Sequence, residues 1–128
     1  MEIHLWCVAA AWLLVYSSKV PVAVAMQQAG GYDNRHPRAQ QAELTGWGAR
    51  SVAAHLNGFE TFAPFAAAVL LAHVAGARTS LADALAVVFV ASRAVYVPCY
   101  IADLATLRSI VWTIGIAATL GLFLAPLL

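Results

Sequence analysis

Three polar side chains interrupt a largely apolar stretch in the first half of the chain, at Arg50, Asn57 and Glu60. Residues seven and three positions apart lie on one face of an α-helix, so these side chains form a single stripe if the stretch is helical. A carboxylate inside a bilayer costs several kcal/mol, and such a residue therefore faces a protein interior or a cavity and has a partner there. The pattern predicts that function is concentrated on this helix.

A second polar face is expected on the next helix, where Arg93, Tyr96 and Tyr100 are spaced at i, i+3 and i+7. An arginine so far from a helix end needs a counter-charge, and Glu60 is the obvious candidate. We therefore expect the two faces to meet, with Glu60 and Arg93 paired. The alternative is a purely structural ion pair that locks the two helices together.

The composition indicates a membrane protein. The chain is 62% hydrophobic and only 10% charged, whereas soluble domains are roughly 25% charged. A soluble domain of this size has too much surface to hide such an excess of apolar residues, so a bilayer is the solvent that fits. The formal net charge of +1 offers no basic surface for nucleic acid. We expect membrane lipids, and no nucleic acid, among the partners.

Four segments are long and apolar enough to cross a bilayer, which takes about 20 residues. They cover about residues 3–26, 52–76, 80–102 and 107–127, with a polar loop over about 27–45. Two tight turns connect the last three segments, and Pro37 is expected to break any helix in the loop. These segments leave no room for a soluble domain. We therefore expect a single all-α domain over residues 1–128, folded as an up-down bundle of four transmembrane helices.

Basic residues near the ends of the segments set the expected orientation. Arg35, Arg38 and Arg50 lie in or near the first connection and Arg108 in the third, whereas only Arg78 lies near the second. The first and third connections are therefore expected in the cytoplasm, with both termini outside.

The cysteines and histidines show no pattern of chemical interest. Cys7 and Cys99 lie in apolar stretches, where small buried hydrophobes are expected rather than a disulfide framework. His4, His36 and His73 show no metal-like spacing with other ligands. No metal site is expected from the sequence.

The two polar motifs resemble those of the MAPEG family, the membrane-associated proteins of eicosanoid and glutathione metabolism. The motifs that carry the resemblance are Asn57-x-x-Glu60-x-x-x-Pro64, preceded by Arg50, and Arg93-x-x-Tyr96-x-x-x-Tyr100. The resemblance extends over essentially the whole chain. It is strongest to the short bacterial branch of the family, whose activity is largely unassigned.

The resemblance implies a homotrimer in the bacterial inner membrane that holds glutathione, or another low-molecular-weight thiol, between protomers near the cytoplasmic side. By position, the thiol-binding residues would be Arg50, Asn57, Glu60, Arg93, Tyr96 and Tyr100. Arginines and tyrosine hydroxyls suit an anion with two carboxylates. Arg108 is the expected catalytic residue, because a guanidinium near the sulfur favours the thiolate, which is the nucleophile.

Two departures from the family pattern bear on activity. Ala53 stands where glutathione-using members usually carry a second arginine, and charged hydrogen bonds of that kind contribute roughly 1.5–3 kcal/mol each. The family position of the activating arginine falls on Leu107, and Arg108 comes one residue later. A difference of one residue in the preceding turn would restore the match.

Three functions remain open at this point. The first is an enzyme that conjugates a thiol to a lipophilic electrophile, or uses the thiol to reduce one. The second is a catalytically silent binding or structural protein of the same fold, which Ala53 favours. The third is a small proton-coupled transporter using Glu60. Other four-span exporters place the acid in the first span, which this chain does not.

Overall fold

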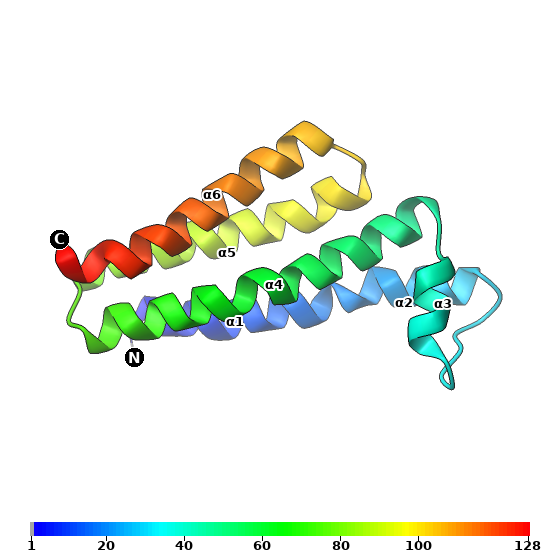
Figure 1. Cartoon of the computed structure of the whole chain (residues 1–128), viewed down its shortest axis with the longest axis horizontal. Coiled ribbons are helices and arrows are strands. Elements are labelled where there is room, and N and C mark those ends of the chain that lie inside the picture. Colours follow the sequence, from blue (N-terminus) through cyan, green and yellow to red (C-terminus); the bar gives the residue numbers. More distant parts are fainter. Residues whose placement is uncertain (1) are drawn as a thin grey trace.

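Long antiparallel helices make up most of the structure, a computed structural model that describes residues 2–128 and contains no strand within them (Figure 1). The long helices are α1 (Ile3–Ser17), continued by α2 (Lys19–Gln28), then α4 (Gly46–Val74), α5 (Thr79–Ile101) and α6 (Ala105–Leu124). The short ones are α3 (Pro37–Glu43) and the 3-10 helix η1 (Ala125–Leu127). The all-α class expected from the sequence is confirmed.

Three helical stretches are long and apolar enough to cross a membrane. They are Ile3–Gln28, Thr79–Ile101 and Ala105–Leu127. Helix α4 is 29 residues long, but polar residues such as Arg50, Asn57 and Glu60 lower its mean hydropathy, and it is not in this group. A fourth span over residues 52–76 therefore stays a prediction.

The first apolar segment is not one continuous helix, because Ser18 separates α1 from α2. The Ser18 hydroxyl donates to the carbonyl oxygen of Val15 at 2.6 Å, and Nδ1 of His55 lies 2.8 Å from the same hydroxyl. Hydrogen bonds from a serine to its own helix commonly bend that helix. Pro21, in the first turn of α2, has no N–H to donate to the carbonyl of Ser17, so the break reflects both Ser18 and Pro21.

The polar loop contains a helix where a broken chain was expected, so the expectation for Pro37 is wrong. Pro37 is the first residue of α3, where a missing N–H and a fixed φ cost nothing. The turn before it is held by Asp33, whose carboxylate accepts the backbone N–H groups of Arg35 and His36, both at 2.9 Å. These N–H groups, that of His36 foremost, lower the pKa of Asp33.

The tight turns expected between the last three helices are present. Gly76 has a φ of 74° and Asp103 a φ of 61°, the left-handed conformation that commonly ends helices. At the end of α4, the N–H of Ala77 donates to the carbonyl of Ala72 at 2.9 Å, which satisfies one of the last free carbonyls. These turns return each helix alongside the one before it.

The core lies in the half of the bundle that contains the start of α1 and the end of α4. Phe65 of α4 and Phe89 of α5 stack with ring centroids 3.8 Å apart and planes 7° from parallel, and Cys7 is buried in the same cluster. Beside this stack, a Cβ at Gly115 of α6 would lie 2.6 Å from Oγ of Ser92 and 3.8 Å from Cδ2 of Phe89. Small residues permit such close helix contact where lipid gives no hydrophobic drive. Both cysteines are buried and free, as expected.

Candidate functional site

A hydrogen-bonded relay connects a buried arginine on α5 with an exposed carboxylate on α4. The Arg93 guanidinium donates to Oδ1 of Asn57 at 2.8 Å, and the Asn57 amide donates to Oε2 of Glu60 at 3.0 Å. Arg93 is only 6% exposed, whereas Glu60 lies at the surface of the chain. The polar faces of the two helices therefore meet, as the sequence predicts.

The direct ion pair expected between Glu60 and Arg93 is absent. No salt bridge among residues 2–128 joins these two side chains, because Asn57 stands between them. An amide side chain offers both an acceptor and donors, so Asn57 can accept from the cation and donate to the carboxylate at once. The negative charge is thus left facing outward rather than neutralised inside the chain.

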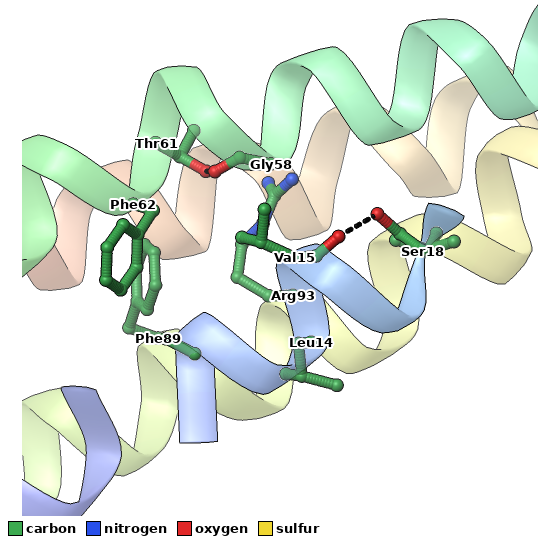
Figure 2. A pocket seen from close by; sticks show the side chains of 10 residues that line it. Leu14, Val15, Ser18, Gly58, Thr61, Phe62, Phe89 and Arg93 are labelled. Atoms are coloured by element: carbon green, nitrogen blue, oxygen red, sulfur yellow. Dashed lines mark hydrogen bonds between the residues drawn. The ribbon is translucent and has the colours of Figure 1, made fainter. Parts of the chain in front are cut away.

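One cavity beside Arg93 is too small for a substrate, whereas a groove on another side of Arg93, lined also by Ser18 and Pro98, has a volume of about 200 Å³. Figure 2 shows the Arg93 side chain rising from α5 toward Gly58 on α4, next to a cavity whose lining comes from α1, α4 and α5. The cavity volume is about 10 Å³, roughly what a single water molecule needs. On its own helix, Arg93 places its Cζ 4.0 Å from the ring centroid of Tyr96. Arg93 therefore positions the side chains of Asn57 and Tyr96 from inside the helix bundle.

A larger groove lies between α5 and α6. Its volume is about 390 Å³, and its lining residues are Tyr96, Tyr100, Arg108, Ser109, Trp112 and Thr113. Cζ of Arg108 lies 4.4 Å from the ring centroid of Tyr100, and the Tyr100 ring meets Tyr96 edge-on with centroids 5.7 Å apart. This volume is within the range of small-ligand sites, about 300–1,000 Å³.

The relay and the groove are connected through Tyr96, which lines the groove and contacts the Arg93 guanidinium of the relay. From α6, Arg108 lies over Tyr100, Tyr100 touches Tyr96, and Tyr96 carries the guanidinium of Arg93. The relay then leads through Asn57 to Glu60. Five of the six residues expected to bind a thiol, together with the expected catalytic arginine, therefore form one connected set on three helices.

Arg50 is the expected site residue that the structure does not bring into this set. Its Nε donates to the carbonyl oxygen of Ile101 at 3.0 Å, at the last residue of α5. A cation there satisfies a free carbonyl and complements the helix dipole. Arg50 therefore fastens α4 to the end of α5.

One known protein family matches almost the whole chain. The family model described as MAPEG family matches residues 3–128. The chain belongs to the MAPEG family. No curated protein and no solved structure matches it. Since the family is one of membrane proteins, the three apolar helical stretches of this MAPEG chain are those of an integral membrane protein.

The first turns of α6 address one of the two departures from the MAPEG pattern. Leu107, at the family position of the activating arginine, is exposed, while Arg108 turns back onto Tyr100 and lines the groove. The arginine one residue later is thus the one that faces α5. The structure does not change the other departure, because Ala53 has no polar side-chain group.

A second polar cluster was missed entirely by the sequence analysis. At the far end of α4, His73 lies close to Glu2 and His4, and the ligating atoms of the three residues are all within 4.8 Å of one another. Their spacing along the sequence carries no signal of this, because only the fold brings the start of α1 to the end of α4. Any MAPEG-type chemistry in the groove is remote from this cluster.

Proposed function

We propose that this protein uses glutathione, or another low-molecular-weight thiol, on a lipophilic electrophile or peroxide in the groove between α5 and α6. The observation that carries the proposal is the placement of the Arg108 guanidinium against Tyr100 in a groove of about 390 Å³. Family membership supports the class of protein. The chemistry rests on the site residues.

The groove residues suit an anionic thiol. Guanidinium groups and tyrosine hydroxyls bind carboxylates, most strongly where water is scarce. Arg108 beside the sulfur would favour the thiolate, with the thiol proton passing to solvent. The sulfur electron pair would then form a bond to the electrophilic carbon, and the leaving group would depart with its own bonding electrons.

The lipophilic partner would reach the groove from the bilayer along α6. A further open groove of about 590 Å³ runs along this helix, and Ser109 and Thr113 line both grooves. Ile110 and Ile114 also line the α6 groove, so an apolar molecule could approach the thiol without crossing water.

Glu60 supports an arrangement in which a neighbouring copy completes the site. The carboxylate is at the surface of a single chain, beside the exposed side chains of Leu56 and Phe59. Facing lipid there would cost several kcal/mol. We therefore propose a homotrimer of four-span protomers in which a second copy covers this face, and in which Glu60 and Asn57 take part in a shared site.

The proposed orientation puts the site near the cytoplasmic face of a bacterial inner membrane. The α2–α4 and α5–α6 connections lie at the same end of the molecule (Figure 1). Arg35 and Arg38 are in the first of these and Arg108 just follows the second, while Arg78 lies at the opposite end. This distribution follows the positive-inside rule.

A catalytically silent binding or structural protein is the second candidate. Two observations favour it. Ala53 cannot supply the guanidinium that glutathione-using relatives are expected to have, and Arg93 is buried with its partner Asn57 already in place. In this reading the relay stabilises the assembly of helices and the groove holds lipid.

Ligand-induced thermal stabilisation of the detergent-solubilised protein distinguishes the two. With millimolar glutathione we expect the unfolding temperature of the wild type and of Arg78→Ala to rise, and that of Arg108→Ala to stay unchanged. Arg78 is the matched control because it is an exposed arginine at the other end of α5. No rise in the wild type, with its oligomeric state intact, would exclude glutathione use and leave the silent protein.

A further inference from the structure

Three metal-ligating atoms form a small triangle where the chain begins and α4 ends, near the N label in Figure 1. Oε2 of Glu2 lies 3.1 Å from Nε2 of His4 and 3.2 Å from Nδ1 of His73. The two histidine nitrogens are 3.2 Å from each other. The three sides of the triangle are thus nearly equal.

This triangle has the size of one face of a zinc coordination shell. With ligand atoms about 2.0–2.1 Å from a tetrahedral Zn²⁺, neighbouring ligand atoms lie about 3.3 Å apart. We infer that Glu2, His4 and His73 bind a divalent transition-metal ion of the zinc type. The site is independent of the proposed thiol chemistry.

Asp83 of α5 orients the central ligand. Its Oδ1 accepts a hydrogen bond from the backbone N–H of His4 at 2.8 Å and lies 2.7 Å from Nδ1 of the same residue. A neutral imidazole that donates from Nδ1 carries its lone pair on Nε2, which is the nitrogen that faces Glu2 and His73. Carboxylate–histidine–metal arrangements of this kind fix the ring and raise its basicity as a ligand.

The burial of the ligands provides both a rigid anchor and an entrance. The His4 side chain is 1% exposed, whereas those of Glu2 and His73 are each 42% exposed. Glu2 is also the N-cap of α1, and its carbonyl accepts the N–H of Leu5 at 3.1 Å, which fixes its backbone. A metal ion could therefore reach the three ligands from the surface and keep one coordination position open for water.

The ligand set favours some metals over others. Two imidazoles and one carboxylate suit Zn²⁺ and its neighbours among the transition metals, whereas Mg²⁺ and Ca²⁺ prefer oxygen ligands alone. Bound there, the ion would fasten the start of α1 to the end of α4 and, through Asp83, to α5. The site would thus act at the end of the molecule opposite the groove.

Calorimetric titration of the metal-stripped, detergent-solubilised protein with Zn²⁺ tests this inference, with no histidine tag and with the native N-terminus. We expect one ion per chain, and an affinity lowered at least about a hundredfold in His73→Ala and Glu2→Gln. His36→Ala is the matched control, because His36 is an exposed histidine in the first loop, and it should bind like the wild type.

Asp83→Asn tests the positioning role separately. Loss of such an outer partner typically weakens metal binding by about 10–100-fold. With Co²⁺ in place of zinc, visible absorption reports the coordination geometry, and we expect the tetrahedral spectrum of the wild type to change in this variant. A purely structural role of Asp83 would leave the spectrum of the bound ion unchanged.

Two outcomes would overturn the inference. One is the absence of stoichiometric Zn²⁺ binding by the wild type, in which case hydrogen bonds among the three side chains account for the triangle. The other is wild-type affinity in both His73→Ala and Glu2→Gln. Both altered side chains are half-exposed, so these variants should fold, as elution volume and unfolding temperature would verify. Competition by Mg²⁺ or Ca²⁺ at equal concentration would contradict the zinc-type assignment.

Discussion

The two polar clusters described above both include a residue of α4, Asn57 in one and His73 in the other, and they differ in chemistry. Asn57 and His73 are roughly 24 Å apart along the axis of α4, with the buried Phe65 midway between them. The cluster at Asn57 continues through Arg93 and Tyr96 to a groove with guanidinium and tyrosine groups, which suit an anion, and its one carboxylate, Glu60, faces outward. The cluster at His73 presents a carboxylate and imidazoles, which suit a cation.

The difference between the clusters teaches how each is built. The first consists of side chains on the facing surfaces of helices. Its buried arginine donates a hydrogen bond to a neutral amide. The second consists of residues at the start of α1 and the end of α4, where exposed side chains surround one buried histidine. A dry aromatic core separates them, so each should respond to its own ligand.

The largest effect is expected from opening that core. Phe65→Ala would remove one ring of the Phe65–Phe89 stack, and such a truncation costs about 3–5 kcal/mol. Chemical unfolding in detergent should therefore show a large loss of stability. Leu70→Ala, at an exposed position of the same helix, is the control. Equal losses in the two variants would show that the Phe65–Phe89 stack contributes no more to stability than an exposed side chain does.

Removal of the buried arginine should have the next largest effect. Arg93→Ala would leave Oδ1 of Asn57 without its donor and remove the contact with the Tyr96 ring. We expect a loss of about 2–4 kcal/mol in the free energy of unfolding. Arg78→Ala should change it by less than about 0.5 kcal/mol. A similarly small change in Arg93→Ala would mean that the relay does not stabilise the fold.

The contact between α5 and α6 gives a smaller effect that can be rescued. In Gly115→Ala the new Cβ would lie 2.6 Å from Oγ of Ser92, and overpacking of this kind costs about 1–3 kcal/mol. The double variant with Ser92→Ala should recover most of the lost stability, measured by unfolding in detergent. Lack of recovery would show that the clash involves more than the hydroxyl.

Helix periodicity explains what the sequence could predict. Arg93, Tyr96 and Tyr100 are on one helix, so their common face follows from spacing alone, and so does the face of Asn57 and Glu60. The relay through Asn57 could not be predicted, because it depends on side-chain rotamers and the exact register of α4 against α5. The expectation that Arg108 has a catalytic role came from the family resemblance and not from spacing, and it stays a prediction.

The parts that sequence reasoning missed depend on the chain's ends and local bonds. Glu2, His4 and His73 come together only through the antiparallel packing of α1 and α4, which no local spacing reveals. The break at Ser18 reflects a hydroxyl that bonds within its own helix and the missing N–H of Pro21. Pro37 was interpreted as a breaker, although proline is equally suited to the first position of a helix.

The smallest effect is expected in the first loop, far from both clusters. The folded-state pKa of Asp33 is lowered by the N–H groups of His36 and Arg35, so the ionised carboxylate stabilises the fold. This stabilisation is complete above the unfolded pKa of about 3.9. It is lost as the pH falls through the folded pKa.

The unfolding temperatures of the wild type and Asp33→Ala should therefore differ near pH 7 and converge as the pH falls through the lowered folded-state pKa of Asp33. Glu43→Ala is the control, since no described hydrogen bond involves the Glu43 carboxylate. A difference for Asp33→Ala that persists unchanged in acid would contradict the role of the ionised group.

The most direct test of the central claim is the ultraviolet difference spectrum of glutathione bound to the detergent-solubilised protein at neutral pH. If Arg108 stabilises the sulfur anion in the α5–α6 groove, the wild type and Arg78→Ala will show thiolate absorbance, and Arg108→Ala will not. Absence of the thiolate signal in the wild type at millimolar glutathione, or its persistence in Arg108→Ala, would contradict the account.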